Sequence, residues 1–243
     1  MDKVIGIHAV AEALRAGRAI QHVLVAKGAH SPRLEEIINE CRRLSVPLRF
    51  EPRQALDRTA ESSAHQGVVA VTAAHRYREL DQVVAAPGGP GLLLLLDGVE
   101  DPHNLGAIIR SAYAAGADAV VIPERRAAGL TETVAKAAAG ALEYLPVARV
   151  PNLNPALEHL KQKEYWIFGL DENAEQSYDR ADYRGRTALV LGGEGKGLHQ
   201  QVARHCDFLV KIPVAGRIAS LNVSVAAGIV LFEALRQRRT EKS

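Results

Sequence analysis

The sequence predicts an α/β protein in which a parallel sheet follows a smaller α/β module. From residue 90 onward, short aliphatic runs alternate with segments of helical periodicity, which is the pattern of strands buried on both faces of a parallel sheet. Before this region, residues 85–91 (AAPGGPG) contain three glycines and two prolines, a composition typical of a linker. We therefore divide the chain into a domain over 1–73, a linker over 74–89 and a larger domain over 90–243.

The first domain is predicted to be a compact α/β module of about 70 residues, near the smallest size at which a domain folds alone. Alternating or periodic apolar residues mark its elements. The expected helices cover residues 4–14 and 33–44, and the expected strands cover 21–26, 47–50 and 68–71.

The larger domain is predicted to alternate strands with helices. The expected strands cover residues 92–96, 119–121, 144–147, 166–170, 187–191 and 208–212, and the expected helices cover 105–115, 131–141, 155–163 and 221–238. The last helix is well marked, because Val223, Ala227, Val230 and Ala234 recur at helical spacing on one face.

Composition excludes several classes of protein. The 30 Lys+Arg and 28 Asp+Glu residues leave a net charge of only +2, which permits a nucleic-acid partner without requiring one. The chain has no apolar run of the roughly 20 residues that a membrane-spanning helix needs, and we expect no membrane contact. Two cysteines and the lack of a secretory signal pattern at the N-terminus predict a cytoplasmic protein without a disulfide framework.

Three loops that follow predicted strands combine small residues with amide or carboxylate side chains. Residues 101–112 (DPHNLGAIIRSA) contain Asn104, a good helix cap, and Arg110 on the flank of the helix that follows. Residues 192–197 (GGEGKG) form a glycine loop, and in residues 212–228 either Ser220 or Asn222 begins the last helix. Ligands of parallel α/β folds bind at the carboxyl ends of the strands, so we expect the three loops to converge on one pocket.

The glycine loop matches neither of the familiar nucleotide-binding motifs. Its spacing is not GxGxxG, and Lys196 is followed by Gly197 rather than by the Ser or Thr of a phosphate-binding loop. Glu194 would place a carboxylate where a phosphate should bind. The loop therefore suits a ligand that has no phosphates and that carries positive charge.

The three loop segments together resemble the motifs of a known family. The segments NLGAIIRSA, LVLGGEGKGL and IPVAGRIASLNVSVA resemble, in order, the three motifs of the SpoU branch of the SPOUT RNA methyltransferases. GIHAV near the N-terminus and HQGVVA at 65–70 resemble the small α/β ribosomal-protein-like RNA-binding domain that precedes the catalytic domain in members acting on a guanosine ribose of large-subunit (23S) ribosomal RNA. The resemblance covers the motifs of both domains.

The resemblance implies a SPOUT-type parallel sheet with a C-terminal trefoil knot. It also implies S-adenosyl-L-methionine as cofactor, large-subunit ribosomal RNA as partner and a homodimer that completes the pocket. The positions in this sequence that it implies for cofactor binding are Gly192, Gly193, Gly197, Ile212 and Leu221.

The resemblance further implies that Arg110 is the catalytic residue. Because an arginine side chain has a pKa above 12, a role as general base conflicts with its normal charge. We therefore expect Arg110 to hold an RNA phosphate and stabilise the developing alkoxide while the proton passes elsewhere. The remaining implied catalytic residues orient Arg110, the cofactor and the ribose, and they are Asn104, Glu194, Ser220 and Asn222.

Methyl transfer to a hydroxyl requires no metal, and the sequence indicates no metal site. His199, His205 and Cys206 match no standard ligand spacing, and we interpret both histidines as surface residues. In the first domain, the candidates for contacts with RNA phosphates are Arg15, Arg18, Lys27, Arg42 and Arg43.

Two alternatives to ribosomal RNA methylation stay open. A transfer-RNA ribose methyltransferase would carry the same motifs, because these motifs do not encode the RNA. A non-catalytic RNA-binding ribosome-assembly factor would keep the fold, but such a protein has no need of Asn104, Arg110, Glu194 and Asn222 together. A Rossmann-type methyltransferase is disfavoured, since its glycine loop should follow the first strand of the domain rather than a late one.

Overall fold

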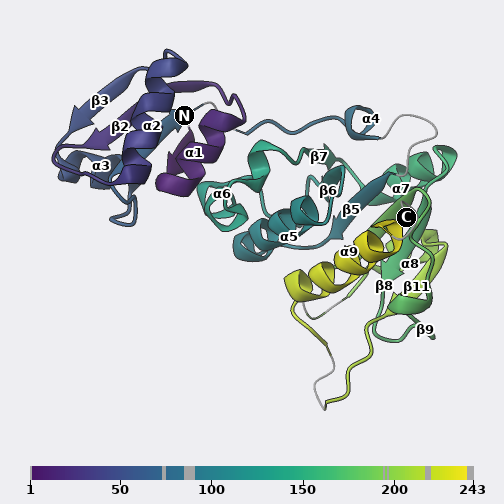
Figure 1. The fold of residues 1–243 in the computed structure, drawn as a ribbon. Coiled ribbons are helices and arrows are strands. Elements are labelled where there is room, and N and C mark those ends of the chain that lie inside the picture. Colours follow the sequence, from purple (N-terminus) through teal and green to yellow (C-terminus); the bar gives the residue numbers. More distant parts are fainter. Residues whose placement is uncertain are drawn as a thin grey trace. The chain divides into compact units, whose positions relative to one another are not determined.

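A computed structural model describes residues 2–72, 75–84, 91–193, 195, 197–216 and 220–239, and it confirms the α/β class (Figure 1). The chain forms two compact units. The smaller unit comprises Met1–Arg76 and Leu130–Tyr144, and the larger comprises Tyr77–Gly129 and Leu145–Ser243. The division at 1–73, 74–89 and 90–243 stays a prediction, and residues 73, 74 and 85–90 lie outside the described residues.

The smaller unit contains a four-stranded sheet in the order β1-β4-β2-β3, in which only β2 and β3 pair in parallel. Its elements are β1 (Asp2–Ile5), α1 (Ile7–Arg15), β2 (Ile20–Ala26), α2 (Pro32–Arg43), β3 (Leu48–Glu51), α3 (Arg53–Ala60), β4 (Val68–Thr72), α6 (Glu132–Ala138) and the short helix η1 (Ala141–Glu143). Side chains alternate across β2. Val23 and Val25 pack with residues of α1 and α2, whereas Leu24 and Ala26 pack with residues of α3.

The prediction of a helix over residues 4–14 is wrong at its start. Val4 and Ile5 pair with Ala70 and Val69 in an antiparallel ladder. Gly6 follows with φ of 94°, a backbone conformation that favours glycine, and α1 begins only at Ile7. Four strand residues are too few to display a period of two beside the longer helical pattern.

The larger unit contains a seven-stranded sheet in the order β7-β6-β5-β10-β8-β11-β9, and all its pairings are parallel. Its elements are α4 (Leu80–Val83), β5 (Leu92–Asp97), α5 (Pro102–Ala114), β6 (Ala119–Pro123), β7 (Val147–Val150), α7 (Leu153–Gln162), β8 (Trp166–Leu170), β9 (Gln176–Ser177), η2 (Tyr178–Arg180), β10 (Thr187–Gly192), α8 (Gln200–His205), β11 (Phe208–Lys211) and α9 (Val223–Arg239). The sheet confirms the predicted parallel architecture.

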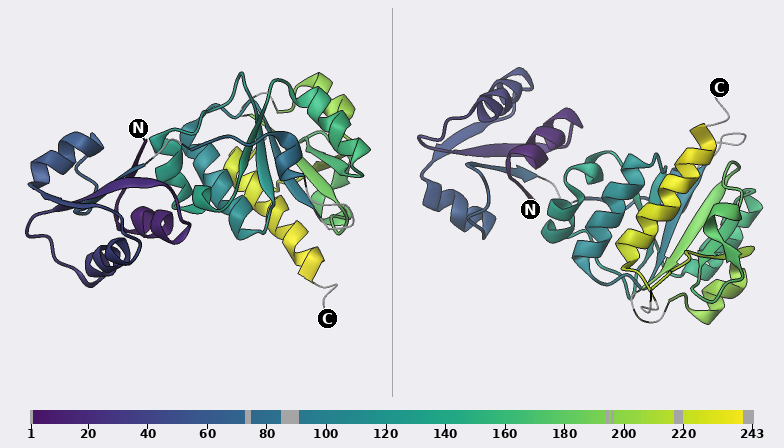
Figure 2. Two further views of the ribbon diagram at one scale, coloured as in Figure 1. Left: turned by 90° about the horizontal axis from the view of Figure 1, so that it is seen from above. Right: turned by 60° about the horizontal axis from the view of Figure 1, so that its bottom comes forward.

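Helices cover both faces of this sheet (Figure 2). Leu93 and Leu95 of β5 belong to a core that includes Leu157 of α7 and Val202 of α8. Helices α5 and α9 pack against each other. Residues 92–96 of β5 are completely buried, which explains why this strand is an uninterrupted aliphatic run rather than an alternating one.

Some larger-unit elements differ from the sequence prediction. The strand expected at 144–147 lies at Val147–Val150, because Ala141–Glu143 form a 3-10 turn that buries Leu142 without joining the sheet. Helices α4 and α8 and strand β9 were not predicted, since elements of four, six and two residues are too short to show a period. In the described part of the chain, no helix is long and apolar enough to cross a membrane.

Candidate active site

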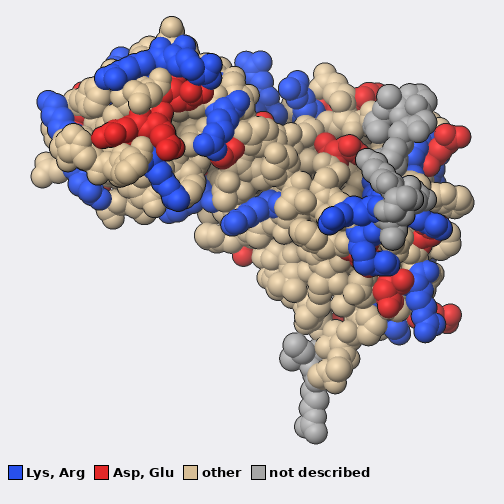
Figure 3. Space-filling view, in the orientation of Figure 1, with Lys and Arg blue, Asp and Glu red and all other residues tan. Residues whose placement is uncertain are grey.

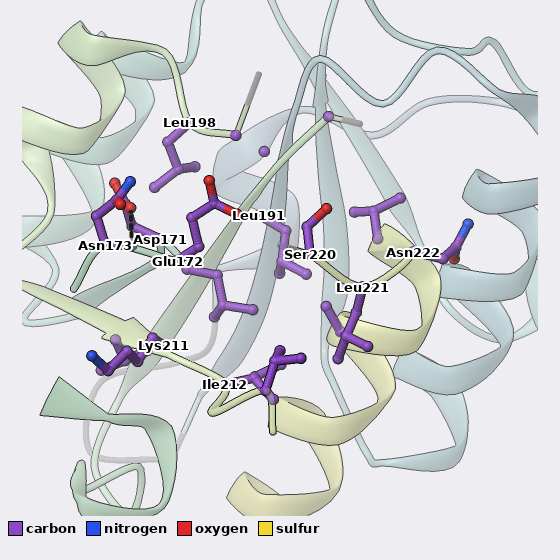
Figure 4. A pocket seen from close by; sticks show the side chains of 18 of the residues that line it. Asp171, Glu172, Asn173, Leu191, Leu198, Lys211, Ile212, Ser220, Leu221 and Asn222 are labelled. Atoms are coloured by element: carbon purple, nitrogen blue, oxygen red, sulfur yellow. Dashed lines mark hydrogen bonds between the residues drawn. The ribbon is translucent and has the colours of Figure 1, made fainter. Parts of the chain in front are cut away.

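The site lies where four neighbouring parallel strands end. Strands β5, β10, β8 and β11 are consecutive in the sheet, so their carboxyl ends meet at one edge and the loops that follow them come together. The loops that follow β10, β8 and β11 line a cavity of about 570 Å³ (Figure 4). Its described lining residues are Leu170, Asp171, Glu172, Asn173, Leu191, Gly192, Gly193, Gly195, Gly197, Leu198, Val210, Lys211, Ile212, Val214, Ser220, Leu221, Asn222, Val223 and Ala226.

The glycine loop forms one wall, and its first two glycines are required by close backbone contact. A Cβ atom on Gly192 would lie 2.0 Å from the carbonyl carbon of Gly197. A Cβ atom on Gly193 would lie 2.0 Å from the carbonyl oxygen of Gly98. The backbone N–H of Gly193 also donates to the carbonyl of Asp97 at 2.8 Å. The loop therefore presents bare backbone to the cavity, and no larger residue fits at these two positions.

Apolar and charged side chains complete the cavity. Ile212 and Leu221 lie together on one side, and Leu191 contributes from the end of β10. Glu172 extends its carboxylate toward the middle of the cavity in Figure 4. Backbone groups and apolar walls with acidic side chains suit a flat, polar-edged group better than a phosphate.

A hydrogen bond joins the first and third loops. The side-chain amide of Asn222 donates to Oδ1 of Asn104 at 3.0 Å. Asn222 also accepts from the backbone N–H of Ser224 at 2.9 Å, which caps the start of α9. Asn104 is 8% exposed and lies in the first turns of α5. This contact fixes the start of α9 against the start of α5.

The structure brings most of the predicted site residues to one place. Gly192, Gly193, Gly197, Ile212, Ser220, Leu221 and Asn222 line the same cavity, and Asn104 is bonded to Asn222. Arg110 is exposed on α5, six residues after Asn104, and lines neither this cavity nor the one beside it. Glu194 lies outside the described residues. The roles assigned to these residues stay predictions.

The segment that follows β8 was not among the predicted site loops. Asp171, Glu172 and Asn173 line the cavity directly after a buried strand. A polar triplet after a parallel strand is the same signal that identified the other three loops, so the sequence did contain the information needed to find it.

His199 makes a contact that its sequence context does not indicate. A second cavity of about 460 Å³ adjoins the first, with Gly193, Gly197 and Val223 lining both. His199 lines this second cavity, and its Nδ1 lies 2.9 Å from Oδ1 of the buried Asp97. With 40% of its side chain exposed, His199 lies at the surface as expected, and it also lines this cavity. Within the described residues no group of histidine, cysteine and acidic side chains is arranged to hold a metal ion.

The first cavity fits S-adenosyl-L-methionine by its chemistry. The described lining residues include two carboxylates, Asp171 and Glu172, and a single cation, Lys211. A net negative lining favours a ligand with positive charge and disfavours one with phosphates. A cavity of about 570 Å³ is within the size range of pockets for small ligands.

The fold and the site define an α/β enzyme domain that binds a small ligand at the edge of a parallel sheet, accompanied by a smaller α/β unit. Residues 91–232 match the model of the SpoU rRNA Methylase family. Residues 3–78 match the model described as RNA 2'-O ribose methyltransferase substrate binding. The chain therefore belongs to the SpoU rRNA methylase family.

Similar proteins cover nearly the whole chain. A protein of Xanthomonas campestris named 23S rRNA (guanosine-2'-O-)-methyltransferase RlmB is 47% identical over 239 residues, which are 97% of this chain and 96% of that protein. The crystal structure of the SpoU methyltransferase AviRb from Streptomyces viridochromogenes, in complex with the cofactor AdoMet, has a TM-score of 0.82 at 27% identity, covering 98% of this chain and 90% of that one. An AdoMet-bound rRNA methyltransferase from Sinorhizobium meliloti has a TM-score of 0.80 at 26% identity, covering 97% and 87%.

Proposed function

We propose that this protein transfers a methyl group from S-adenosyl-L-methionine to the ribose 2'-oxygen of a guanosine in 23S ribosomal RNA. The observation that carries the proposal is that residues of the second and third family motifs line one cavity, while Asn104 of the first motif is bonded to Asn222 of the third at 3.0 Å. The substrate is supported by the relative that is named for this reaction and is 47% identical over 97% of the chain.

In this proposal the cofactor is held by backbone and apolar groups of the first cavity. Gly192, Gly193 and Gly197 present backbone, while Ile212 and Leu221 supply apolar contact. When bound, the cofactor supplies a methyl group on a cationic sulfur that a hydroxyl oxygen can attack. The protein then has to align the two reactants and assist the loss of the hydroxyl proton.

Arg110 is the proposed catalytic residue, with Asn104, Glu194, Ser220 and Asn222 as its partners in orienting the reactants. A guanidinium stays charged at neutral pH, so Arg110 stabilises the alkoxide and its neighbouring phosphate electrostatically. Since Arg110 is exposed and lines neither cavity of its own chain, we propose that it acts in a site completed by a second copy.

The face formed by α5 and α9 supports such a homodimer. Helix α9 buries Val230 and Leu231, yet it also exposes Val225 (51%) and Phe232 (49%). Tyr113 on the neighbouring helix α5 is 45% exposed. A helix that is apolar around most of its surface normally has partners on more than one side. We further propose a cytoplasmic enzyme with the C-terminal trefoil knot that is typical of SPOUT domains.

The smaller unit is the proposed binding domain for ribosomal RNA. Lys and Arg side chains border its visible face around a group of acidic side chains (Figure 3). One predicted phosphate contact is wrong: Arg18 is largely buried and pairs with Glu143 at 2.8 Å, both within the smaller unit. Arg42 and Lys27 are exposed and stay candidates.

A methyl-transfer assay tests the proposed function. The purified protein is incubated with labelled S-adenosyl-L-methionine and ribosomal RNA from cells that lack this protein, and we expect label on one guanosine ribose. Label on a base contradicts the assignment, label only on transfer RNA identifies the alternative substrate, and no label with intact RNA binding identifies an assembly factor.

Substitution of Arg110 tests its proposed role. Arg110→Ala should abolish transfer while calorimetry shows unchanged cofactor affinity. Arg110→Lys keeps the charge but loses the planar fork, so little rescue supports guanidinium geometry, whereas strong rescue with a shifted pH–rate profile supports a base. Near-normal turnover of Arg110→Ala would remove the central residue of the mechanism.

A further inference from the structure

The second cavity contains a hydrogen-bonded chain that fixes the orientation of an arginine. Asp97, 6% exposed at the end of β5, accepts from the backbone N–H of His199 at 2.8 Å. Its other carboxylate oxygen lies 2.9 Å from His199 Nδ1. On the far side of the ring, His199 Nε2 lies 3.2 Å from a terminal nitrogen of Arg126.

The chemistry of the two ends determines the state of the histidine between them. A guanidinium only donates hydrogen bonds, so Nε2 must accept from Arg126. Nδ1 therefore carries the proton and donates to Asp97. In this arrangement His199 is neutral and accepts one N–H of Arg126, and no other residue that the structure describes bonds the remaining guanidinium N–H groups.

The backbone at Arg126 is a second and independent feature. Arg126 has φ of 58°, the left-handed region that residues other than glycine seldom adopt. Such conformations persist where the surroundings enforce them, and they concentrate at functional sites. Of the six non-glycine residues with positive φ in the described chain, Arg126 is the one that lines the second cavity.

The charges in the cavity decide between two possible ligand groups. Its described lining includes the carboxylates of Asp97, Glu100 and Asp101 against the one guanidinium of Arg126. With His199 neutral, this set is net negative, which disfavours an RNA phosphate. Asp97 is occupied by His199, and Asp101 accepts from the backbone N–H of His103 at 2.8 Å. Glu100 is exposed, and no described residue bonds its carboxylate.

A guanidinium fork beside a free carboxylate complements the edges of guanine. Guanine presents the acceptors O6 and N7, for which arginine is the commonest specific partner. Its other edge presents N1–H and the N2 amino group, which a carboxylate accepts. Adenine would place its N6 amino group against the arginine and its N1 acceptor toward the carboxylate, so it is rejected by the same groups.

We propose that the second cavity is the recognition site for the base of the target guanosine, with Arg126 reading O6 and N7 and Glu100 reading N1 and N2. His199 and Asp97 are positioning residues that hold Arg126. The inference rests on the proposed function, because the cavity adjoins the cofactor cavity and includes Asn104. It assigns the choice of guanosine to the larger unit itself.

Base analogues at the target position test the proposal. The nucleotide methylated in the assay above is replaced, in otherwise identical RNA, by 7-deazaguanosine, which lacks N7, or by inosine, which lacks the N2 amino group. We expect wild-type transfer to fall about ten-fold or more with either analogue. Asparagine tolerates a left-handed backbone, so Arg126→Asn should fold. This variant should methylate 7-deazaguanosine RNA as fast as guanosine RNA, and it should still methylate inosine RNA more slowly. Glu100→Ala should show the reverse.

Controls separate recognition from folding and from the proposed function. Cofactor affinity and thermal unfolding of both variants should match wild type, and Arg125→Ala, an exposed neighbour outside the cavity, should keep both penalties. Equal penalties in Arg126→Asn and wild type, or a uniform loss by this variant on all three RNAs, would overturn the proposal. Absence of wild-type transfer to any guanosine ribose would instead overturn the proposed function.

Discussion

Replacing Gly193 by alanine tests whether the glycine loop forms the cofactor cavity by close backbone contact. The new Cβ would lie 2.0 Å from the carbonyl oxygen of Gly98 and 2.7 Å from its carbonyl carbon. Real Cβ contacts essentially never fall under 3.0 Å, so the two backbones must separate by about 1 Å. Neither side is a flexible side chain that can turn away.

The size of the effect follows from this displacement. Overpacking of this kind costs about 1–3 kcal/mol of stability. A shift of about 1 Å in a loop that positions a reactant can lower the reaction rate about 100-fold. We expect the Gly193→Ala protein to fold, to unfold at a lower temperature, and to bind S-adenosyl-L-methionine at least about ten-fold more weakly, equivalent to about 1.4 kcal/mol.

Calorimetric titration with the cofactor measures the affinity, and thermal unfolding measures the stability. Gly185→Ala is the matched control, because a Cβ at Gly185 meets no atom within 4 Å and its φ is ordinary. We expect it to leave both quantities unchanged. Wild-type cofactor affinity in a folded Gly193→Ala protein would refute the assignment of this loop to the cofactor.

Three further predictions concern an ion pair of the smaller unit and the two thiols. Arg18→Ala should lower the free energy of unfolding by up to about 3–5 kcal/mol, since it removes the arginine partner of Glu143, whose side chain is only 7% exposed and which keeps only His75, at 3.6 Å, as an ion-pair partner among the described residues. Arg15→Ala, with 61% of its side chain exposed, should change the free energy of unfolding by no more than about 0.5 kcal/mol in the same thermal melts. Burial raises the pKa of Cys41 from 9.0 to about 11 and that of Cys206 to about 12. Both thiols should therefore resist alkylation at pH 8 until the chain unfolds, and rapid labelling of native protein would contradict this. Because the unfolded chain loses these protons first, the free energy of unfolding should fall as pH rises from 9.0 toward 11.

The parallel sheet was predictable because its strands carry their own signal. Residues 92–96 are fully buried, and a strand covered by helices on both faces has no reason to contain a polar residue. The start of α1 was not predictable in the same way. Val4 and Ile5 belong to a strand only because β4 lies beside them, and that pairing partner is more than sixty residues away in the sequence.

One part of the candidate site that the sequence predicted is the glycine loop, where backbone rather than side chains lines the cavity. Glycines in a loop after a parallel strand indicate a close approach without saying to what, and the structure identifies the contacts as Gly98 and Gly197. The second cavity was not predictable, because Asp97, Arg126 and His199 come from separate segments and no short motif contains them. Only the order of strands in the sheet places them together.

Asp97 bonds to residues that line both cavities and thereby fixes the position of one cavity relative to the other. Its backbone carbonyl accepts from Gly193 at 2.8 Å, and its carboxylate accepts from the backbone N–H of His199 at 2.8 Å. Gly193 of the glycine loop and His199, two residues beyond the loop, are therefore both bonded to the last residue of β5, a strand in the interior of the sheet. The wall of the cofactor cavity and the histidine that holds Arg126 are consequently positioned by the same carboxyl end. Two reactants are aligned only if the groups that hold them keep a fixed distance from each other. A strand inside the sheet fixes that distance more precisely than a loop does.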